Sequence, residues 1–119
     1  MSTTLLDASD GILTIEVKGK ISPASLASAQ GQILETLQLW GGGSILLLCD
    51  EFEGWTSGDW SDTSFQIQAD NLLLKMAIIG ELQWKDMAMA FTGQGYRPFP
   101  IAFFESGLAE SAKAWLKAE

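Results

Sequence analysis

Five carboxylates crowd the middle of the chain, where they could transfer protons or bind a hard cation. They are Asp50, Glu51, Glu53, Asp59 and Asp62. Paired carboxylates suit general acid–base chemistry, and oxygen ligands suit calcium or magnesium. Their spacing does not match a calcium-binding loop, and the sequence has no histidine to support a transition-metal site. We therefore interpret the acidic run as solvated surface charge, and we predict neither a metal site nor a cofactor.

The absence of histidine and the single cysteine also restrict catalysis. Histidine is the most frequent general base, so nucleophilic catalysis by a Ser–His or Cys–His pair within the chain is excluded. Cys49 lies in an apolar run, where cysteine behaves as a small hydrophobic residue. A lone cysteine also excludes an internal disulfide and a thiolate zinc site. We therefore expect no catalytic residues and a protein that is not an enzyme.

Large apolar side chains are the second group of candidate functional residues. Six of them follow two apolar runs of the sequence: Phe52, Trp55, Trp60, Trp84, Met87 and Phe91. Aromatic and methionine side chains suit adaptable apolar binding, so these six are candidates for the wall of a ligand site. Alternatively they close the core, as apolar side chains at helical spacing usually do. Both interpretations remain open at this point.

Arg97 is the candidate polar contact for such a ligand. It follows Gly93 and Gly95 in a segment that could act as a lid, with the glycines as hinges and the arginine reaching an anionic headgroup. The same segment is equally well explained as a plain connection between a helix and a strand. The two glycines do not follow a strand, so they are not a dinucleotide-binding fingerprint.

Length, composition and charge limit the class of protein and its partners. With 119 residues, 47% of them hydrophobic, the chain is predicted to fold as one domain over residues 1–119. A formal charge of −8 repels nucleic acid and anionic lipid, so we expect no nucleic-acid partner and at most a peripheral membrane contact. No apolar run approaches the ~20 residues that span a bilayer. The first residues do not resemble a secretory signal, and the lone cysteine fits a reducing compartment, so a cytoplasmic location is expected.

The first half of the chain has the pattern of a hairpin, a helix and a buried strand. Apolar and polar residues alternate over 13–17, which predicts a half-buried strand after a short first strand at 5–6. Ser22, followed by a proline, predicts a helix that runs to the glycines at 41–43. The continuous apolar run 44–49 predicts a strand covered on both faces.

The second half alternates loops, helices and strands. The expected elements are a loop over 50–59, helices over 65–73 and 84–91, strands over 75–80 and 101–104, and a last helix capped by Ser106. Together the elements predict an α/β fold with a mixed, mostly parallel β-sheet and about four helices. Ligands of such sheets bind beyond the carboxyl ends of the parallel strands, which is where the loop over 50–59 is expected.

Several short motifs occur in an order that resembles a known family. They are Val17-Lys18-Gly19-Lys20, Phe52-Glu53-Gly54-Trp55, Ala77-Ile78-Ile79-Gly80 and Ala112-Lys113-Ala114-Trp115-Leu116. Over nearly its whole length the chain resembles the SpoIIAA-like family, whose fold is similar to the STAS domains of anti-sigma-factor antagonists. The resemblance implies a single STAS-like domain that is bacterial, cytoplasmic and without enzymatic activity. It also implies a role in protein interaction or in binding a lipophilic molecule.

The sequence departs from the anti-sigma-factor antagonists at their phosphorylation site. Those proteins carry an Asp-Ser-Ser-Gly block after the central strand, and a partner kinase phosphorylates one of its serines. Here the same place reads Asp50-Glu51-Phe52-Glu53-Gly54-Trp55-Thr56-Ser57-Gly58. A phosphate on Thr56 or Ser57 would meet acidic neighbours and no nearby arginine, so the sequence predicts no clear phosphorylation switch.

Two classes of function follow from these residues. In the first, the protein binds a small lipophilic or amphipathic molecule through the six apolar residues, and Arg97 supplies a polar contact. In the second, the same aromatics anchor a protein partner or a homodimer, as in a regulatory module. A ligand-binding module predicts an apolar cavity near Trp55 and Trp84. An interaction module predicts a flat apolar patch without a cavity.

Overall fold

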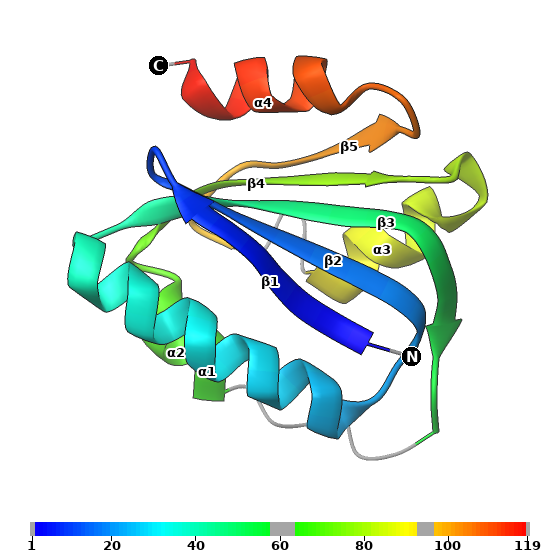
Figure 1. Cartoon of the computed structure of the whole chain (residues 1–119), viewed down its shortest axis with the longest axis horizontal. Helices are drawn as coiled ribbons and strands as arrows, with labels where there is room; N and C mark the ends of the chain where they lie inside the picture. Colours follow the sequence, from blue (N-terminus) through cyan, green and yellow to red (C-terminus); the bar gives the residue numbers. More distant parts are fainter. Residues whose placement is uncertain (1, 58–63, 93–96, 119) are drawn as a thin grey trace.

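The computed structural model describes residues 2–57, 64–92 and 97–118, and these form a mixed five-stranded sheet (Figure 1). The strands are β1 (Ser2–Ser9), β2 (Ile12–Ile21), β3 (Gly43–Trp55), β4 (Leu73–Gly80) and β5 (Ile101–Glu105). They lie in the sheet in sequence order. β1 is antiparallel to β2, and the other neighbouring pairs are parallel. The predicted mixed and mostly parallel sheet is therefore confirmed.

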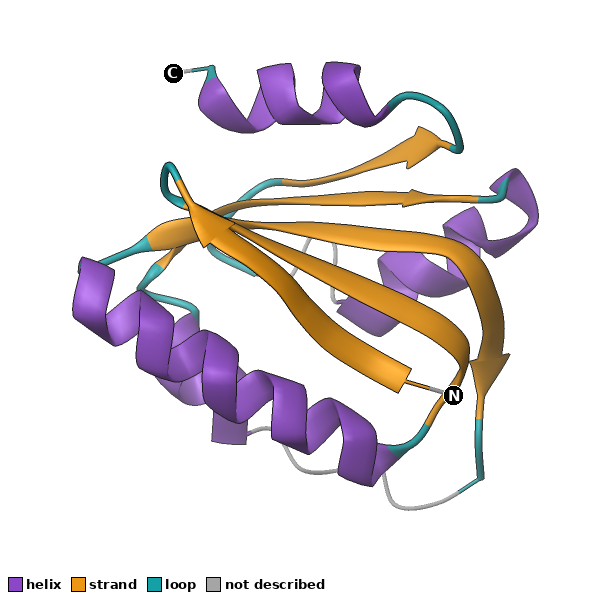
Figure 2. Ribbon diagram, in the orientation of Figure 1, coloured by secondary structure: helices purple, strands orange, loops and turns teal. Residues whose placement is uncertain are grey.

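Helices cover both faces of this sheet. They are α1 (Pro23–Trp40), α2 (Ser64–Ala69), α3 (Lys85–Thr92) and α4 (Ala109–Lys117), with a 3₁₀ turn, η1 (Leu82–Trp84), leading into α3. α1, α2 and α3 lie on one face, and α4 lies on the other (Figure 2). Because β3 and β4 are covered from both sides, their continuous apolar runs are buried, as the sequence pattern predicted.

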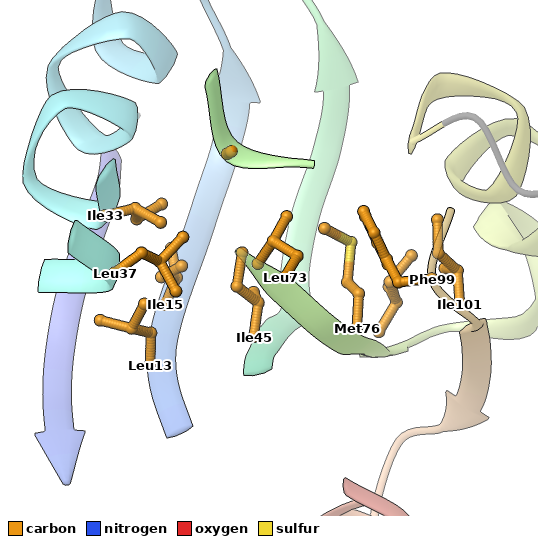
Figure 3. Packing of buried hydrophobic residues seen from close by; sticks show 11 residues of the cluster. Leu13, Ile15, Ile33, Leu37, Ile45, Leu73, Met76, Phe99 and Ile101 are labelled. Atoms are coloured by element: carbon orange, nitrogen blue, oxygen red, sulfur yellow. The ribbon is translucent and has the colours of Figure 1, made fainter. Parts of the chain in front are cut away.

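The larger part of the core lies on the face of the sheet that α1 and α2 cover (Figure 3). Leu13 and Ile15 of β2 pack there with Ile33 and Leu37 of α1. On the opposite face, the alternate residues of the parallel strands pack against α4. These are Leu46 of β3 and Ala77 and Ile79 of β4, which meet Ala112 and Leu116. The two-residue period of the strands thus divides one apolar run between two cores.

Both ends of α1 were predicted correctly from the Ser22 cap and the glycines that follow the helix. The Ser22 hydroxyl accepts a hydrogen bond from the Ser25 backbone N–H at 3.1 Å, and the Ser25 hydroxyl accepts one from the Ser22 N–H at 3.2 Å. This reciprocal pair satisfies two donors that the first turn leaves free. The helix ends at Gly41, whose φ of 76° is left-handed, so glycine is favoured there. The chain then enters β3 beside β2.

The structure corrects three predicted boundaries. Asp50–Trp55 is not a loop, because it continues β3 alongside β2. The second helix ends at Ala69, since Leu73 is buried as the first residue of β4. Ser106 does not cap α4, which has Leu108 at its N-cap and no side-chain cap. In each case long-range pairing or packing overrides local propensity.

The cap of α1 can be tested by removing a single oxygen. Ser22→Ala should lower the free energy of unfolding by about 1 kcal/mol, because the backbone N–H of Ser25 loses its hydrogen-bond acceptor. Ser28→Ala is the matched control, since Ser28 lies on the exposed side of the same helix, and its effect should stay within about 0.5 kcal/mol. Urea denaturation of both variants measures the difference. Equal losses in the two variants would contradict the capping role.

Candidate functional site

The second half of β3 contains two more residues than the stretch of β2 with which it pairs. One extra residue lies between Leu48 and Glu51, and the second is Glu53. Such bulges bend a strand and turn its side chains in new directions. In Figure 1, β3 curves strongly at this end. Phe52 and Trp55, which are three positions apart, therefore reach the same cluster, although a regular strand would send them to opposite faces.

Four aromatic side chains meet at this bend and form what we call the aromatic cluster. Its members are Phe52, Trp55, Trp84 and Phe91. The Phe52 ring is edge-on to both indoles, with ring centroids 4.8 Å from Trp55 and 5.0 Å from Trp84. The two indoles are 6.2 Å apart, and Phe91 lies 5.2 Å from Trp55. Each such pair contributes about 0.5–1.5 kcal/mol beyond its buried area, so the cluster holds η1 and α3 to the end of β3.

Gly54 permits the backbone conformation of β3 at the cluster. Its φ is 110°, a conformation that residues with a Cβ rarely adopt. A Cβ at this position would lie 3.5 Å from Cη2 of Trp84, which is an ordinary van der Waals contact, so the backbone conformation and not the indole is what favours glycine. The positive φ of this glycine belongs to the bend of β3. The sequence motif that contains Gly54 does not reveal this backbone role.

The aromatic cluster forms one end of a partly open cavity with a volume of about 120 Å³. All five strands and the helices α1, α2 and α3 contribute side chains to its lining. Most of these side chains are apolar, including Leu26 of α1, Phe65 of α2 and Phe103 of β5. An engineered cavity of ~150 Å³ binds benzene, so this volume suits one ring or a short alkyl chain.

The structure brings five of the seven predicted site residues to this cavity. The five are Phe52, Trp55, Trp84, Phe91 and Arg97. Met87 is absent from the lining and 51% of its side chain is exposed, because Ala88 takes the inward position of α3 instead. Trp60 lies outside the described residues. Sequence reasoning also missed Thr3 and Gln30, whose polar side chains line the cavity without any motif to mark them.

Arg97 lines the cavity, but its charge is already paired. Its side chain is only 8% exposed, and Nε donates to Oδ1 of Asp70 at 2.8 Å. Nη2 contacts the same carboxylate oxygen, and Nη1 donates to the Thr92 carbonyl at 2.9 Å. The guanidinium also lies 4.7 Å from the centroid of the Phe99 ring. These contacts tie the turn after α2 to the end of α3 and the segment before β5.

Three buried polar side-chain atoms in the described part of the chain have no hydrogen-bond partner, and all three belong to residues that line the cavity. They are Nε1 of Trp55, Nε1 of Trp84 and Oγ1 of Thr3. Folded proteins leave few buried polar groups unpaired, because each costs about 1–3 kcal/mol. Two unpaired indole N–H donors in one aromatic cluster are therefore a distinctive feature of this cavity.

Cys49 lines the same cavity as a protonated thiol. Burial raises its pKa from 9.0 to about 12, and the negative charge of Asp50 acts in the same direction. The thiolate, which is the reactive form, is therefore scarce near neutral pH. The residue behaves as the small hydrophobic side chain that its place in an apolar run predicted.

The acidic residues of this region lie away from the cavity lining. Glu51 is exposed and its carboxylate lies 3.4 Å from the Lys18 ammonium, which also approaches Glu16. The hydrogen bond to Glu51 and the two negative charges raise the pKa of Lys18. No group of three or more potential metal ligands occurs in the part of the chain that the structure describes. Asp59 and Asp62 fall outside it.

The fold and these motifs agree with the comparison to known proteins. A family model described as SpoIIAA-like matches residues 12–117. The chain belongs to the SpoIIAA-like family. No curated protein matches the sequence. Among the helices of the described residues, none is long and apolar enough to cross a membrane.

Solved structures with the SpoIIAA fold are similar over almost the whole chain. An uncharacterised protein from Shewanella loihica PV-4 with a SpoIIAA-like fold has a TM-score of 0.69 at 21% identity, covering 97% of this chain and 92% of its own. The anti-sigma factor antagonist SpoIIAA in its unphosphorylated form has a TM-score of 0.67 at 9% identity, covering 98% and 100%. The Bacillus cell fate determinant SpoIIAA in its phosphorylated form has a TM-score of 0.61 at 10% identity, covering 96% and 99%. At these identities the similarity establishes the shared fold.

The role of Gly54 can be separated from general glycine effects. Gly54→Ala should lower the free energy of unfolding by about 1–3 kcal/mol, because alanine is strained at a φ of 110°. Gly31→Ala should instead raise it by up to about 1 kcal/mol, since Gly31 lies in α1 with nothing within 4 Å of an added Cβ. Urea denaturation distinguishes the two signs. A stabilising Gly54→Ala would show that the bend of β3 does not need glycine.

The protonated state of Cys49 can be tested with a thiol reagent. Near pH 8 the folded protein should react with 5,5′-dithiobis(2-nitrobenzoate) about a thousandfold more slowly than the unfolded chain, as expected for a thiol whose pKa rises from 9.0 to about 12. The chain has one cysteine, so the absorbance change reports Cys49 alone. Unfolding in urea provides the fast reference rate. Equal rates in the folded and unfolded states would contradict the buried, protonated thiol.

Proposed function

We propose that this SpoIIAA-like protein is a non-enzymatic binding module for a small lipophilic or amphipathic molecule. The observation that carries the proposal is the apolar cavity of about 120 Å³, closed at one end by the aromatic cluster. A cavity near Trp55 and Trp84 is what the ligand-binding alternative predicts, whereas the interaction alternative predicts a flat patch. Pockets lined by apolar side chains with a few polar groups are typical of small-molecule sites.

The size of the cavity sets the expected affinity. One aromatic ring buries about 150 Å² of apolar surface, which corresponds to about 4 kcal/mol at ~25 cal/mol per Å². This gain alone corresponds to a dissociation constant of about 1 mM, and the cost of association makes the binding of a single ring weaker than that. Each methylene group that a longer ligand buries beyond the ring adds about 0.8 kcal/mol. A natural ligand of micromolar affinity would therefore extend through the open side of the cavity.

The absence of enzymatic activity is part of the proposal. Near neutral pH the thiol of Cys49 is protonated, and the Arg97 guanidinium is paired with Asp70. The described lining therefore offers no nucleophile beside a general base. A reducing, cytoplasmic location fits the single unpaired cysteine.

A protein-interaction role is the second candidate. Leu82 and Met87 expose more than half of their side chains on η1 and α3, beside the wall of the cavity. Exposed apolar side chains of this kind often belong to an interface. One structural neighbour is an anti-sigma factor antagonist, so a regulatory partner protein fits the fold. Size-exclusion chromatography of Met87→Ser tests a homodimer, which this change would weaken without altering the cavity.

The binding proposal can be tested with 1-hexanol as a neutral probe of short-chain length. In a Trp40→Phe/Trp115→Phe background, which removes the tryptophans of α1 and α4, titration should give a saturable fluorescence change at millimolar concentration. Trp84→Ala in this background should abolish the saturable change, because it removes one wall of the cavity. Phe104→Leu is the control, since Phe104 packs with Trp115 on the opposite face and should preserve the response. A linear response identical in all variants would contradict a binding cavity.

A further inference from the structure

The unpaired indole groups define part of the chemistry of the ligand. An indole nitrogen can only donate a hydrogen bond, so Trp55 and Trp84 each need an acceptor. Neither nitrogen finds one in the protein, although both are buried and both side chains line the cavity. The Thr3 hydroxyl, from β1, is also unpaired, and Thr3 belongs to the same lining. A pure hydrocarbon would leave all three groups unsatisfied.

The charges of the lining restrict the acceptor further. Arg97 is the one charged residue among the described lining residues, and Asp70 accepts from it through a carboxylate oxygen. Thr92 engages another of its nitrogens. An anionic ligand would therefore enter an apolar cavity without a free cation, and burying an unpaired charge is very costly. The formal charge of −8 on the protein opposes an anion as well.

We propose that the ligand is a neutral compound with a carbonyl-type oxygen that accepts hydrogen bonds from the indole groups of Trp55 and Trp84. This inference rests on the proposed binding function and narrows it to a class that includes ketones, aldehydes, esters and quinones. The apolar part of the ligand fills the space against Leu26 and Phe65, and the oxygen turns toward the aromatic cluster. In this inference the indole groups, rather than Arg97, supply the polar contact, because Arg97 is paired with Asp70.

Three probes of similar shape test this chemistry. Acetophenone carries the neutral carbonyl, α-methylstyrene replaces the oxygen by a methylene group, and benzoate carries a charge. In ¹H–¹⁵N spectra, acetophenone should move the indole N–H signals of Trp55 and Trp84 downfield, while the Trp115 signal on the opposite face stays in place. α-Methylstyrene should produce no downfield shift. Trp→Phe variants assign each signal.

Affinities measured by calorimetry provide an independent readout. We define the preference ratio as the dissociation constant of α-methylstyrene divided by that of acetophenone. Trp55→Phe and Trp84→Phe should each lower this ratio about fivefold, since each removes one donor, and the comparison cancels the different water solubilities of the probes. Trp115→Phe should leave the ratio unchanged. Benzoate should bind the wild-type protein at least about tenfold more weakly than acetophenone.

The outcomes separate the inference from the proposed function. If none of the three probes binds, the binding function itself fails. If probes bind but neither indole signal moves downfield and the ratio is the same in all variants, the hydrogen-bonding inference fails and the cavity stands. Tighter binding of benzoate than of acetophenone would overturn the neutral class. Asp70→Asn should raise benzoate affinity, because it frees the charge of Arg97. If this variant does not fold, the affinities of benzoate and acetophenone for the wild-type protein test the neutral class.

Discussion

The cavity depends on the pairing of the second half of β3 with β2. That pairing continues only because β3 absorbs two extra residues, and the resulting bend brings Phe52 and Trp55 to one side of the sheet. Gly54 permits the backbone conformation, with a φ of 110° that residues with a Cβ rarely adopt. The same few residues thus shape the strand, attach η1 and α3 to it, and close one end of the hollow. A regular strand here would place one of the two aromatics on the opposite face.

Charge is kept out of the cavity by pairing rather than by exclusion. Arg97 is almost fully buried, but Asp70, the Thr92 carbonyl and the Phe99 ring surround its guanidinium. Removal of one partner from a buried ion pair typically costs about 3–5 kcal/mol, so the pair acts as a structural link between three segments. Among the described residues, the buried side-chain atoms that lack a partner are neutral: two indole donors and one hydroxyl. The charge of Arg97 is thus compensated within the protein, while these neutral groups are not.

Local patterns were sufficient for most of the fold. The Ser22 cap, the glycines after α1 and the continuous apolar runs of β3 and β4 each have a short-range physical cause, and each was found correctly. The acidic, glycine-containing end of β3 was misjudged, because such residues are rare in strands and only pairing with β2 holds them there. Met87 was expected at the site but is exposed. Apolar residues at helical spacing do not reveal which side of a short helix packs against the rest of the protein.

The sequence by itself determined the α/β class, the mixed sheet, the family and the set of aromatic side chains available for a site. The fold class follows from residue types and from periods of two and 3.6 residues, which are properties of the chain at short range, whereas the family follows from the resemblance of its short motifs. Only the tertiary structure decided that Phe52, Trp55, Trp84 and Phe91 share one cluster, that Arg97 is paired with Asp70, and that two indole nitrogens lack acceptors. Those facts depend on distances between residues far apart in the chain, and a bend of β3 that no local pattern specifies sets the distances within the cluster.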